Sequence, residues 1–244
     1  MRRNNLSDCA SCALIPREKV CMNPKGKGSK GCPTLGKKKL ADRAKKKYQP
    51  AGIREFARQA SIQEGECYAG RDQRPYVMHP TKPRIQEICE FARKMGYTRL
   101  GLVFCVGLYR EAAMVARILQ SQGFETVSVV CKVGSMPKEE IGVKDSEKIF
   151  IGEYESMCNP VLQAVIVNDA ETDFNVLLGL CVGHDSLFFK YAEAPTTVLA
   201  VKDRVTGHNP LGPIYLSGNY YSWLNKPDVS VSLCVHYTIT ISYN

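Results

Sequence analysis

The sequence predicts an α/β protein with a three-layer, doubly wound and mostly parallel sheet. A small cysteine-rich metal module and a helical arm are expected to precede the sheet. From residue 85 onward, short apolar segments alternate with segments of helical periodicity, which is typical of parallel strands joined by right-handed crossovers. The strand segments are apolar with little alternation, as expected for a sheet covered on both faces.

The predicted organisation has four parts: a metal-binding module, a basic arm with a loop, an α/β domain and a C-terminal extension, at residues 1–34, 35–84, 85–216 and 217–244. The first part has almost no large apolar side chains, so a bound metal ion or another cross-link is needed to order it. The arm contains two helical patterns and a loop rich in proline, at residues 35–48, 52–65 and 65–84.

The elements of the α/β domain follow from its periodicity. The predicted helices cover residues 85–96, 109–123, 159–170 and 185–192, and the predicted strands cover residues 99–105, 124–131, 174–181 and 196–203. Asn159 is the expected N-cap of the third helix, with Pro160 at its first position. Cys89 falls on the buried face of the first helix and is interpreted as a core residue. Residues 229–243 alternate like an amphipathic strand, and Cys234 and His236 there are interpreted as non-functional.

Three predicted strands end in cysteine, and glycine follows two or three residues later. They read "FCVG", "VCKVG" and "LCVG" and end at Cys105, Cys131 and Cys181. Cys158 precedes a predicted helix, and a helix N-terminus favours thiolate over thiol. Because parallel strands end at one edge of a sheet, we expect these four cysteines to form a thiolate-ligated centre there. The alternative is that each is a small buried residue that suits a strand.

Polar residues follow the same strand ends and favour a catalytic role for that edge. They are His184, Asp185, Lys202, Asp203 and His208. Singly, each is typical of a hydrogen-bonding loop residue, but together at a strand-end crevice they would supply proton donors and acceptors. His184 is the expected partner of Cys181. An enzyme that acts on a small molecule through an iron–sulfur cluster or a bare thiolate is therefore the first alternative to a metal-binding protein.

A second set of cysteines lies near the N-terminus, with the spacing C-x2-C-x8-C-x10-C, and comprises Cys9, Cys12, Cys21 and Cys32. The first pair has the spacing with which two thiolates hold one tetrahedral ion. A structural Zn²⁺ is the first prediction for this set and a [4Fe–4S] cluster the alternative, because four thiolates suit both. A second iron–sulfur cluster is considered at the strand ends.

The charge of the chain is uneven. Residues 1–58 hold 16 Lys and Arg against 4 Asp and Glu, whereas the remainder holds 17 against 20. A basic segment of this kind attracts the phosphate backbone of nucleic acids, and a nucleic-acid-binding protein is the further alternative. We favour a solvated helical face, because no aromatic residues interleave with the lysines at residues 35–48 to stack on bases.

The eleven cysteines also bear on location. An odd number spread over a chain of 244 residues is not typical of a secreted disulfide framework. No signal-peptide core precedes the first helix, and no run of 18 apolar residues predicts a membrane span. A cytoplasmic protein with reduced thiols is the expectation. The sequence contains neither a P-loop nor a G-x-G-x-x-G motif, so it does not indicate nucleotide binding.

Several of these motifs together resemble a family of unknown function from bacteria and archaea, whose members are regarded as metal-binding because of their cysteines. The motifs are "CASC", "FARKMGYTRLGLVFCVGLYREA", "VCKVG", "MCNPVLQA", "LCVGHDSLF" and "APTTVLAVKDRVTGHNP". The resemblance covers about residues 9–216 and implies metal binding without assigning a reaction. The residues on its motifs are Cys9, Cys12, Cys105, Cys131, Cys158, Cys181, His184 and His208.

Overall fold

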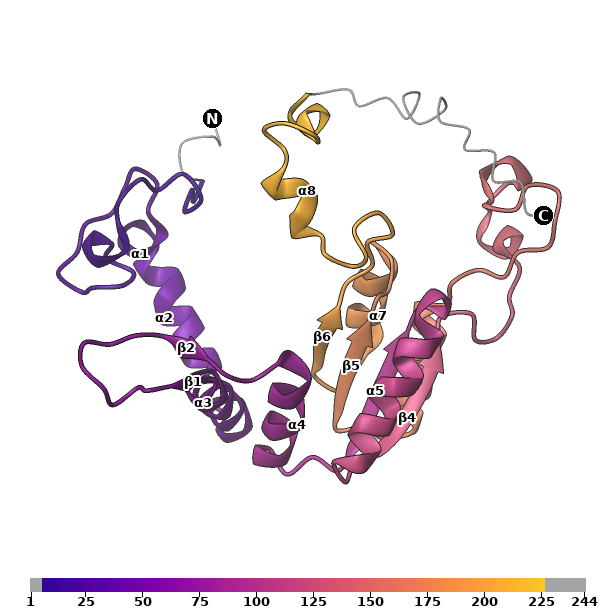
Figure 1. The fold of residues 1–244 in the computed structure, drawn as a ribbon, viewed down its shortest axis with the longest axis horizontal. Coiled ribbons are helices and arrows are strands. Elements are labelled where there is room, and N and C mark those ends of the chain that lie inside the picture. The colour runs from indigo at the N-terminus through magenta and orange to yellow at the C-terminus, as the bar shows by residue number, and fades with distance from the viewer. Residues whose placement is uncertain (1–5, 227–244) are drawn as a thin grey trace. The chain divides into compact units, whose positions relative to one another are not determined.

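The structure is a computed structural model that describes residues 6–226. The chain divides into two compact units between Lys82 and Pro83. The first unit contains the cysteine-rich segment and the basic arm, and the second contains the sheet (Figure 1).

The first unit is built from helices and one short strand pair. Its elements are α1 (Pro33–Gly36), α2 (Lys38–Lys47), α3 (Ala51–Glu66), β1 (Tyr68–Ala69) and β2 (His79–Pro80). The two longer helices confirm the helical patterns of the arm. The antiparallel pair β1–β2 was not predicted, because a segment rich in proline reads as a loop. α3 is only partly buried, since Ile53 is 52% exposed.

The second unit alternates helices and strands as predicted up to its last strand, which a short helix that was not predicted follows. Its elements are α4 (Arg84–Lys94), β3 (Arg99–Phe104), α5 (Tyr109–Ser121), β4 (Glu125–Val130), α6 (Pro160–Asp169), β5 (Phe174–Leu178), α7 (His184–Tyr191), β6 (Thr196–Ala200) and α8 (Leu211–Tyr215). The four strands are parallel throughout, in the order β4-β3-β5-β6. After β3 the chain forms β4 on one side of it, and then crosses to the other side to form β5 and β6. All four strands end at the same edge of the sheet.

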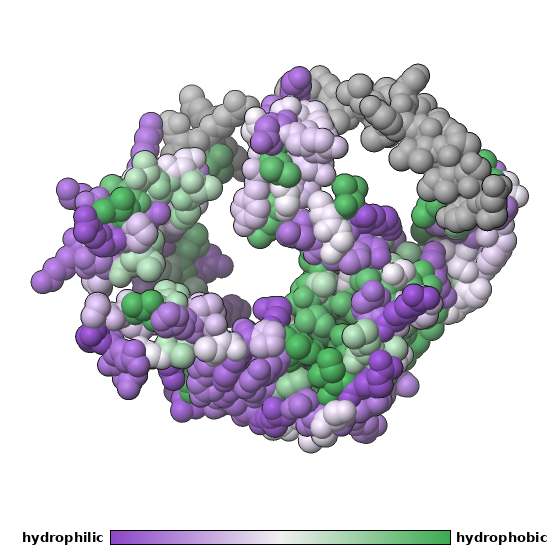
Figure 2. All heavy atoms as spheres, viewed as in Figure 1, coloured by the Kyte–Doolittle hydropathy of each residue, from purple (hydrophilic) through white to green (hydrophobic). Residues whose placement is uncertain are grey.

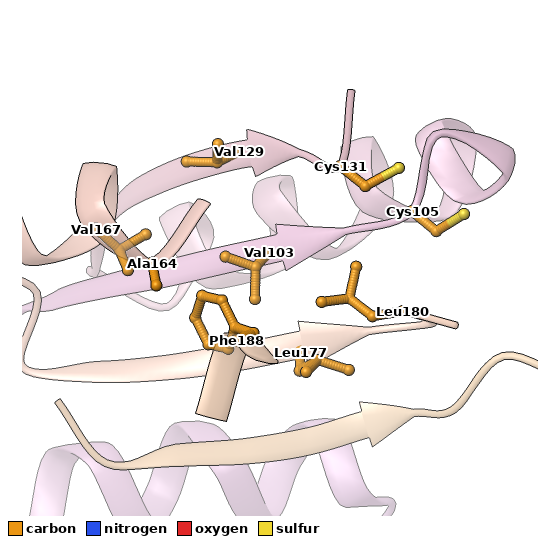
Figure 3. Packing of buried hydrophobic residues seen from close by; sticks show 9 residues of the cluster. All are labelled: Val103, Cys105, Val129, Cys131, Ala164, Val167, Leu177, Leu180 and Phe188. Carbon is orange, nitrogen blue, oxygen red and sulfur yellow. The ribbon is translucent and has the colours of Figure 1, made fainter. Parts of the chain in front are cut away.

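One face of the sheet packs against α6 and α7. Val103, Val129 and Leu177, from three neighbouring strands, form a buried cluster with Val167 of α6 and Phe188 of α7 (Figure 3). Side chains of a strand alternate between the two faces, so Leu100 and Leu102, both fully buried, belong to the opposite face. Figure 2 shows one group of hydrophobic residues over the sheet and α5, with others elsewhere on the visible surface. Cys89 is 2% exposed on α4, which confirms its assignment to the core.

Two predictions from the sequence concern the C-terminal strand and membrane-spanning helices. The amphipathic strand at residues 229–243, with Cys234 and His236, lies outside the described residues. Within residues 6–226, no helix combines the length and the apolar content that a membrane crossing requires.

Asp173 joins the starts of two strands and gives the fold a pH dependence. Its carboxylate accepts hydrogen bonds from the backbone N–H groups of Thr98 and Arg99, both at 2.8 Å. Burial opposes ionisation, but these hydrogen bonds together hold the pKa of Asp173 below its ordinary value. The stability that it contributes is present above the unfolded pKa of about 3.9 and is lost as the pH falls through the lower folded value.

We therefore expect Asp173→Asn to reduce the free energy of unfolding by about 1–2 kcal/mol at pH 7, because the amide accepts these bonds less strongly. The difference from the unsubstituted protein should shrink as the pH falls below about 3.9. Urea unfolding followed across this pH range measures it. The exposed Asp169, changed to Asn, is the control, with an effect within about 0.5 kcal/mol. A difference at pH 7 that persists unchanged at acid pH would refute the explanation.

Candidate functional site

Strand register places Cys105 beside Cys131. Phe104 of β3 lies opposite Val130 of β4, and the backbone N–H of Cys131 donates to the carbonyl oxygen of Phe104 at 2.8 Å. Each cysteine follows a buried valine by two residues, so both occupy the sheet face that α6 and α7 cover. Figure 3 shows the two sulfurs extending past the strand ends in the same direction. Because both cysteines also belong to the buried cluster, their thiols form the edge of the core.

Cys158 reaches the same place from the residue before the N-cap of α6. The backbone N–H of Asn159 donates to the carbonyl oxygen of Cys131 at 2.7 Å, and the Sγ atoms of Cys131 and Cys158 lie 3.8 Å apart. The Asn159 side chain accepts a hydrogen bond from the N–H of Leu162 at 3.0 Å and so caps α6. This confirms the predicted cap, which fixes the backbone next to Cys158.

His184 begins α7 and lies against Cys158. Hydrogen bonding between the two side chains raises the pKa of His184 above its ordinary value. Its Nδ1 atom is buried, and no atom of residues 6–226 makes a hydrogen bond with it. The backbone N–H of His184 donates to the carbonyl oxygen of Cys181 at 3.0 Å, and the pairing of their side chains stays a prediction. A buried nitrogen without a partner is uncommon in folded proteins.

Cys181 has a different neighbour, which the sequence analysis missed. Arg204 Nη2 donates to Cys181 Sγ at 3.1 Å, and this hydrogen bond is the main reason that the pKa of the guanidinium is raised. Arg204 follows the predicted last strand, as the other candidate residues follow theirs. That position, directly after the last predicted strand, is the signal in the sequence that marks Arg204.

Lys202 adds a second cation. Its Nζ atom lies 3.2 Å from the position that a Cβ on Gly107 would occupy, and it interacts with Cys105. The predicted strand-end lysine is thus placed beside a strand-end thiol.

The three adjacent thiols share protons unequally. Hydrogen bonding with Cys131, followed by the N–H of Gly107 and the charge of Lys202, lowers the pKa of Cys105 against the effect of burial. Hydrogen bonding with Cys131 and then with His184 lowers the pKa of Cys158. The pKa of Cys131 is raised by its bonds to these two thiols. Neighbouring thiols cannot all ionise easily, so the arrangement favours thiolates at Cys105 and Cys158 with a proton held at Cys131.

The remaining predicted polar residues make hydrogen bonds within turns. Asp185 Oδ1 accepts from the N–H groups of Gly183 and Ser186, at 3.0 and 2.7 Å. Asp203 Oδ1 accepts from the N–H groups of residues 205 and 206, both at 3.0 Å. His208 Nδ1 accepts from the N–H of Asp203 at 3.1 Å. These side chains shape the loops that carry His184, Lys202 and Arg204.

The N-terminal cysteines lie in the first unit. Cys9 and Cys21 are exposed, and Cys12 and Cys32 are partly buried. The N–H of Cys12 donates to the carbonyl oxygen of Cys9 at 3.3 Å, which closes a tight turn between them. Hydrogen bonding from Ser29 lowers the pKa of Cys12. Among residues 6–226, neither these cysteines nor the strand-end thiols include three His, Cys, Asp or Glu side chains placed so that they could hold a metal ion.

Comparison with known proteins places these residues in a wider group. A family profile described as "Protein of unknown function (DUF1847)" matches residues 32–199. An uncharacterized protein of Methanocaldococcus jannaschii is 45% identical over 163 residues, which is 67% of this chain and 81% of that protein. No solved structure matches the chain. The range of the family match includes all four strand-end cysteines but only Cys32 of the N-terminal set.

Proposed function

The chain belongs to the DUF1847 family of proteins of unknown function, and from this premise we propose that its strand-end thiols bind a thiophilic metal. Zn²⁺ or an iron–sulfur cluster would be held through Cys131 and Cys158, with Cys105 and Cys181 as further ligands. The observation that carries the proposal is the 3.8 Å separation of the Cys131 and Cys158 sulfurs. Two thiolates bound to one tetrahedral Zn²⁺, each at about 2.3 Å, lie about 3.8 Å apart.

The charges around the thiols support the same proposal. A thiolate centre concentrates negative charge, which nearby cations or a metal must compensate. Lys132 and His184 act electrostatically on Cys158, Lys202 acts on Cys105, and Arg204 contacts Cys181. The buried, unpartnered Nδ1 of His184 is the kind of atom that a ligand at this edge would satisfy.

The proposal includes the layer arrangement predicted from the sequence. We propose a three-layer, doubly wound sheet in which the strand order reverses between β3 and β5. Right-handed crossovers on the two sides of β3 would place α5 and α6 on opposite faces. In such sheets the ligand crevice lies outside the carboxyl ends of the strands, where the order reverses. Cys105 follows β3 and Cys181 follows β5, so both lie at that reversal.

We propose a second centre in the first unit. Cys9, Cys12, Cys21 and Cys32 would share one Zn²⁺, with a [4Fe–4S] cluster as the alternative. The support is the knuckle spacing of Cys9 and Cys12 and the scarcity of large apolar residues around them. The small-molecule enzyme, the nucleic-acid-binding alternative and the cytoplasmic location stay predictions from the sequence.

Protein purified without oxygen tests both the presence and the type of metal. The proposal predicts sulfur-bound metal in excess of one equivalent per chain by elemental analysis. Zinc would leave the solution colourless, whereas an iron–sulfur cluster would give broad absorption near about 400 nm. A protein with no more than one equivalent, and with all strand-end thiols open to titration, would leave the strand-end proposal without support.

A further inference from the structure

We infer that Cys131 and Cys158 form a thiol–disulfide exchange pair whose substrate class is a low-molecular-weight disulfide. Their sulfurs lie 3.8 Å apart, and a disulfide bond measures about 2.05 Å, so less than about 2 Å of approach is needed. The hydrogen bond from the N–H of Asn159 to the carbonyl oxygen of Cys131, 2.7 Å long, already holds the two backbones together. Closure therefore requires side-chain rotation more than movement of the chain.

The two sulfurs differ in access, which assigns their roles. Cys131 is 1% exposed, whereas Cys158 is only partly buried. An incoming disulfide can therefore reach Cys158 first, and Cys131 is placed to attack the product from behind it. His184, at the start of α7, lies against Cys158. The resolving thiol Cys131 accepts a hydrogen bond from the N–H of Val106 at 3.3 Å, which orients that sulfur.

The exchange has two balanced steps. The Cys158 thiol loses its proton and attacks one sulfur of the small disulfide; the sulfur–sulfur bond breaks, and the first released thiolate takes up that proton. Cys131 then attacks Cys158 Sγ, which breaks the mixed disulfide and forms the protein disulfide, and the proton of Cys131 passes to the second released thiolate. The two protein thiols lose two electrons and two protons, and the small disulfide gains both to become two thiols.

The exchange pair and the proposed metal site would use the same two sulfurs, so a bound metal and the disulfide exclude each other. Bound metal should then protect the pair from exchange. Metal content must for that reason be measured on the same samples as the disulfide, so that each idea can fail separately.

The experiment uses the full chain, as purified and after dialysis against a chelator, with elemental analysis of both samples. Each is treated with oxidised glutathione, alkylated and digested with trypsin without reduction. Cleavage after Lys and Arg puts Cys105 and Cys131 on separate peptides, but Cys158 and Cys181 share one peptide, residues 149–190. Tandem mass spectrometry, or the same digest of Cys181→Ser, therefore identifies which sulfur is linked.

The expected product in the chelated sample is a peptide of residues 118–132 linked to residues 149–190 through Cys158, two hydrogens lighter than the separate peptides. Cys131→Ser, or Cys131→Ala if the first variant folds poorly, should instead accumulate glutathione on Cys158. Cys89→Ser, at a core cysteine of α4, should leave the cross-link unchanged. A cross-link without strand-end metal would support the exchange pair and count against the metal proposal. Full reduction of both cysteines, or a dominant bond from Cys131 to Cys105, would overturn the inference.

Discussion

Replacing Cys131 and Cys158 together by alanine is expected to remove all metal from the carboxyl edge of the sheet. Structural zinc sites of four ligands contribute about 10–16 kcal/mol of binding. Loss of half of the thiolates should therefore weaken binding by at least about three orders of magnitude, and dialysis should then empty the site. The variant protein should hold about one metal equivalent less per chain than the unsubstituted protein.

The matched control replaces two other buried cysteines, Cys67 and Cys89, by alanine. Both are as well buried as Cys131 to within a few per cent of exposed area, at 7% and 2% against 1%, so the general cost of losing core thiols is similar. This control should keep its metal. Circular dichroism checks that both variants fold. Equal metal content in the two double variants would show that the strand-end sulfurs are core residues only.

The second large effect concerns the first unit. Cys9→Ser combined with Cys12→Ser should release one further metal equivalent, because these residues form the pair with the spacing of a tetrahedral site. A segment so poor in apolar side chains should lose its order with the metal. The sheet should stay folded, since β3 to β6 and their helices belong to the other unit.

Limited proteolysis and elemental analysis together measure this effect. New cleavage is expected within residues 6–32 while the fragment beginning near Pro83 stays resistant. Cys21→Ser alone should weaken the same site, which separates a shared ion from a local effect of the Cys9–Cys12 turn. A double variant that keeps its full metal content would contradict the four-cysteine centre.

Much of the fold could be read from the sequence, since the signals involved are local. Apolar runs marked β3 to β6, helical periodicity marked α4 to α6, and Asn159 with Pro160 marked the start of α6. Parallel topology then brought Cys105 and Cys131 to one edge in register. The pair β1–β2 was missed because only two residues on each side pair, within a segment of prolines.

The partners of the thiols could not be read in this way. Cys158 returns to Cys131 after a long excursion whose ends are joined by backbone hydrogen bonds, including Met157 N–H to the carbonyl oxygen of Met136 at 2.7 Å. No periodicity marks such a return. β5 ends at Leu178, three residues before Cys181, so this cysteine leaves the register that aligns the other two and reaches Arg204 instead.

We propose that the strand-end thiols hold a metal through their sulfur atoms. X-ray absorption of the Cys9→Ser, Cys12→Ser protein, purified without oxygen, tests it directly because the N-terminal ligand set is then incomplete. Retained metal with a shell of sulfur neighbours at about 2.3 Å is expected, and this shell should disappear when Cys131 and Cys158 are also replaced. Absence of bound metal, or a shell of nitrogen and oxygen alone at about 2.0–2.2 Å, would contradict it.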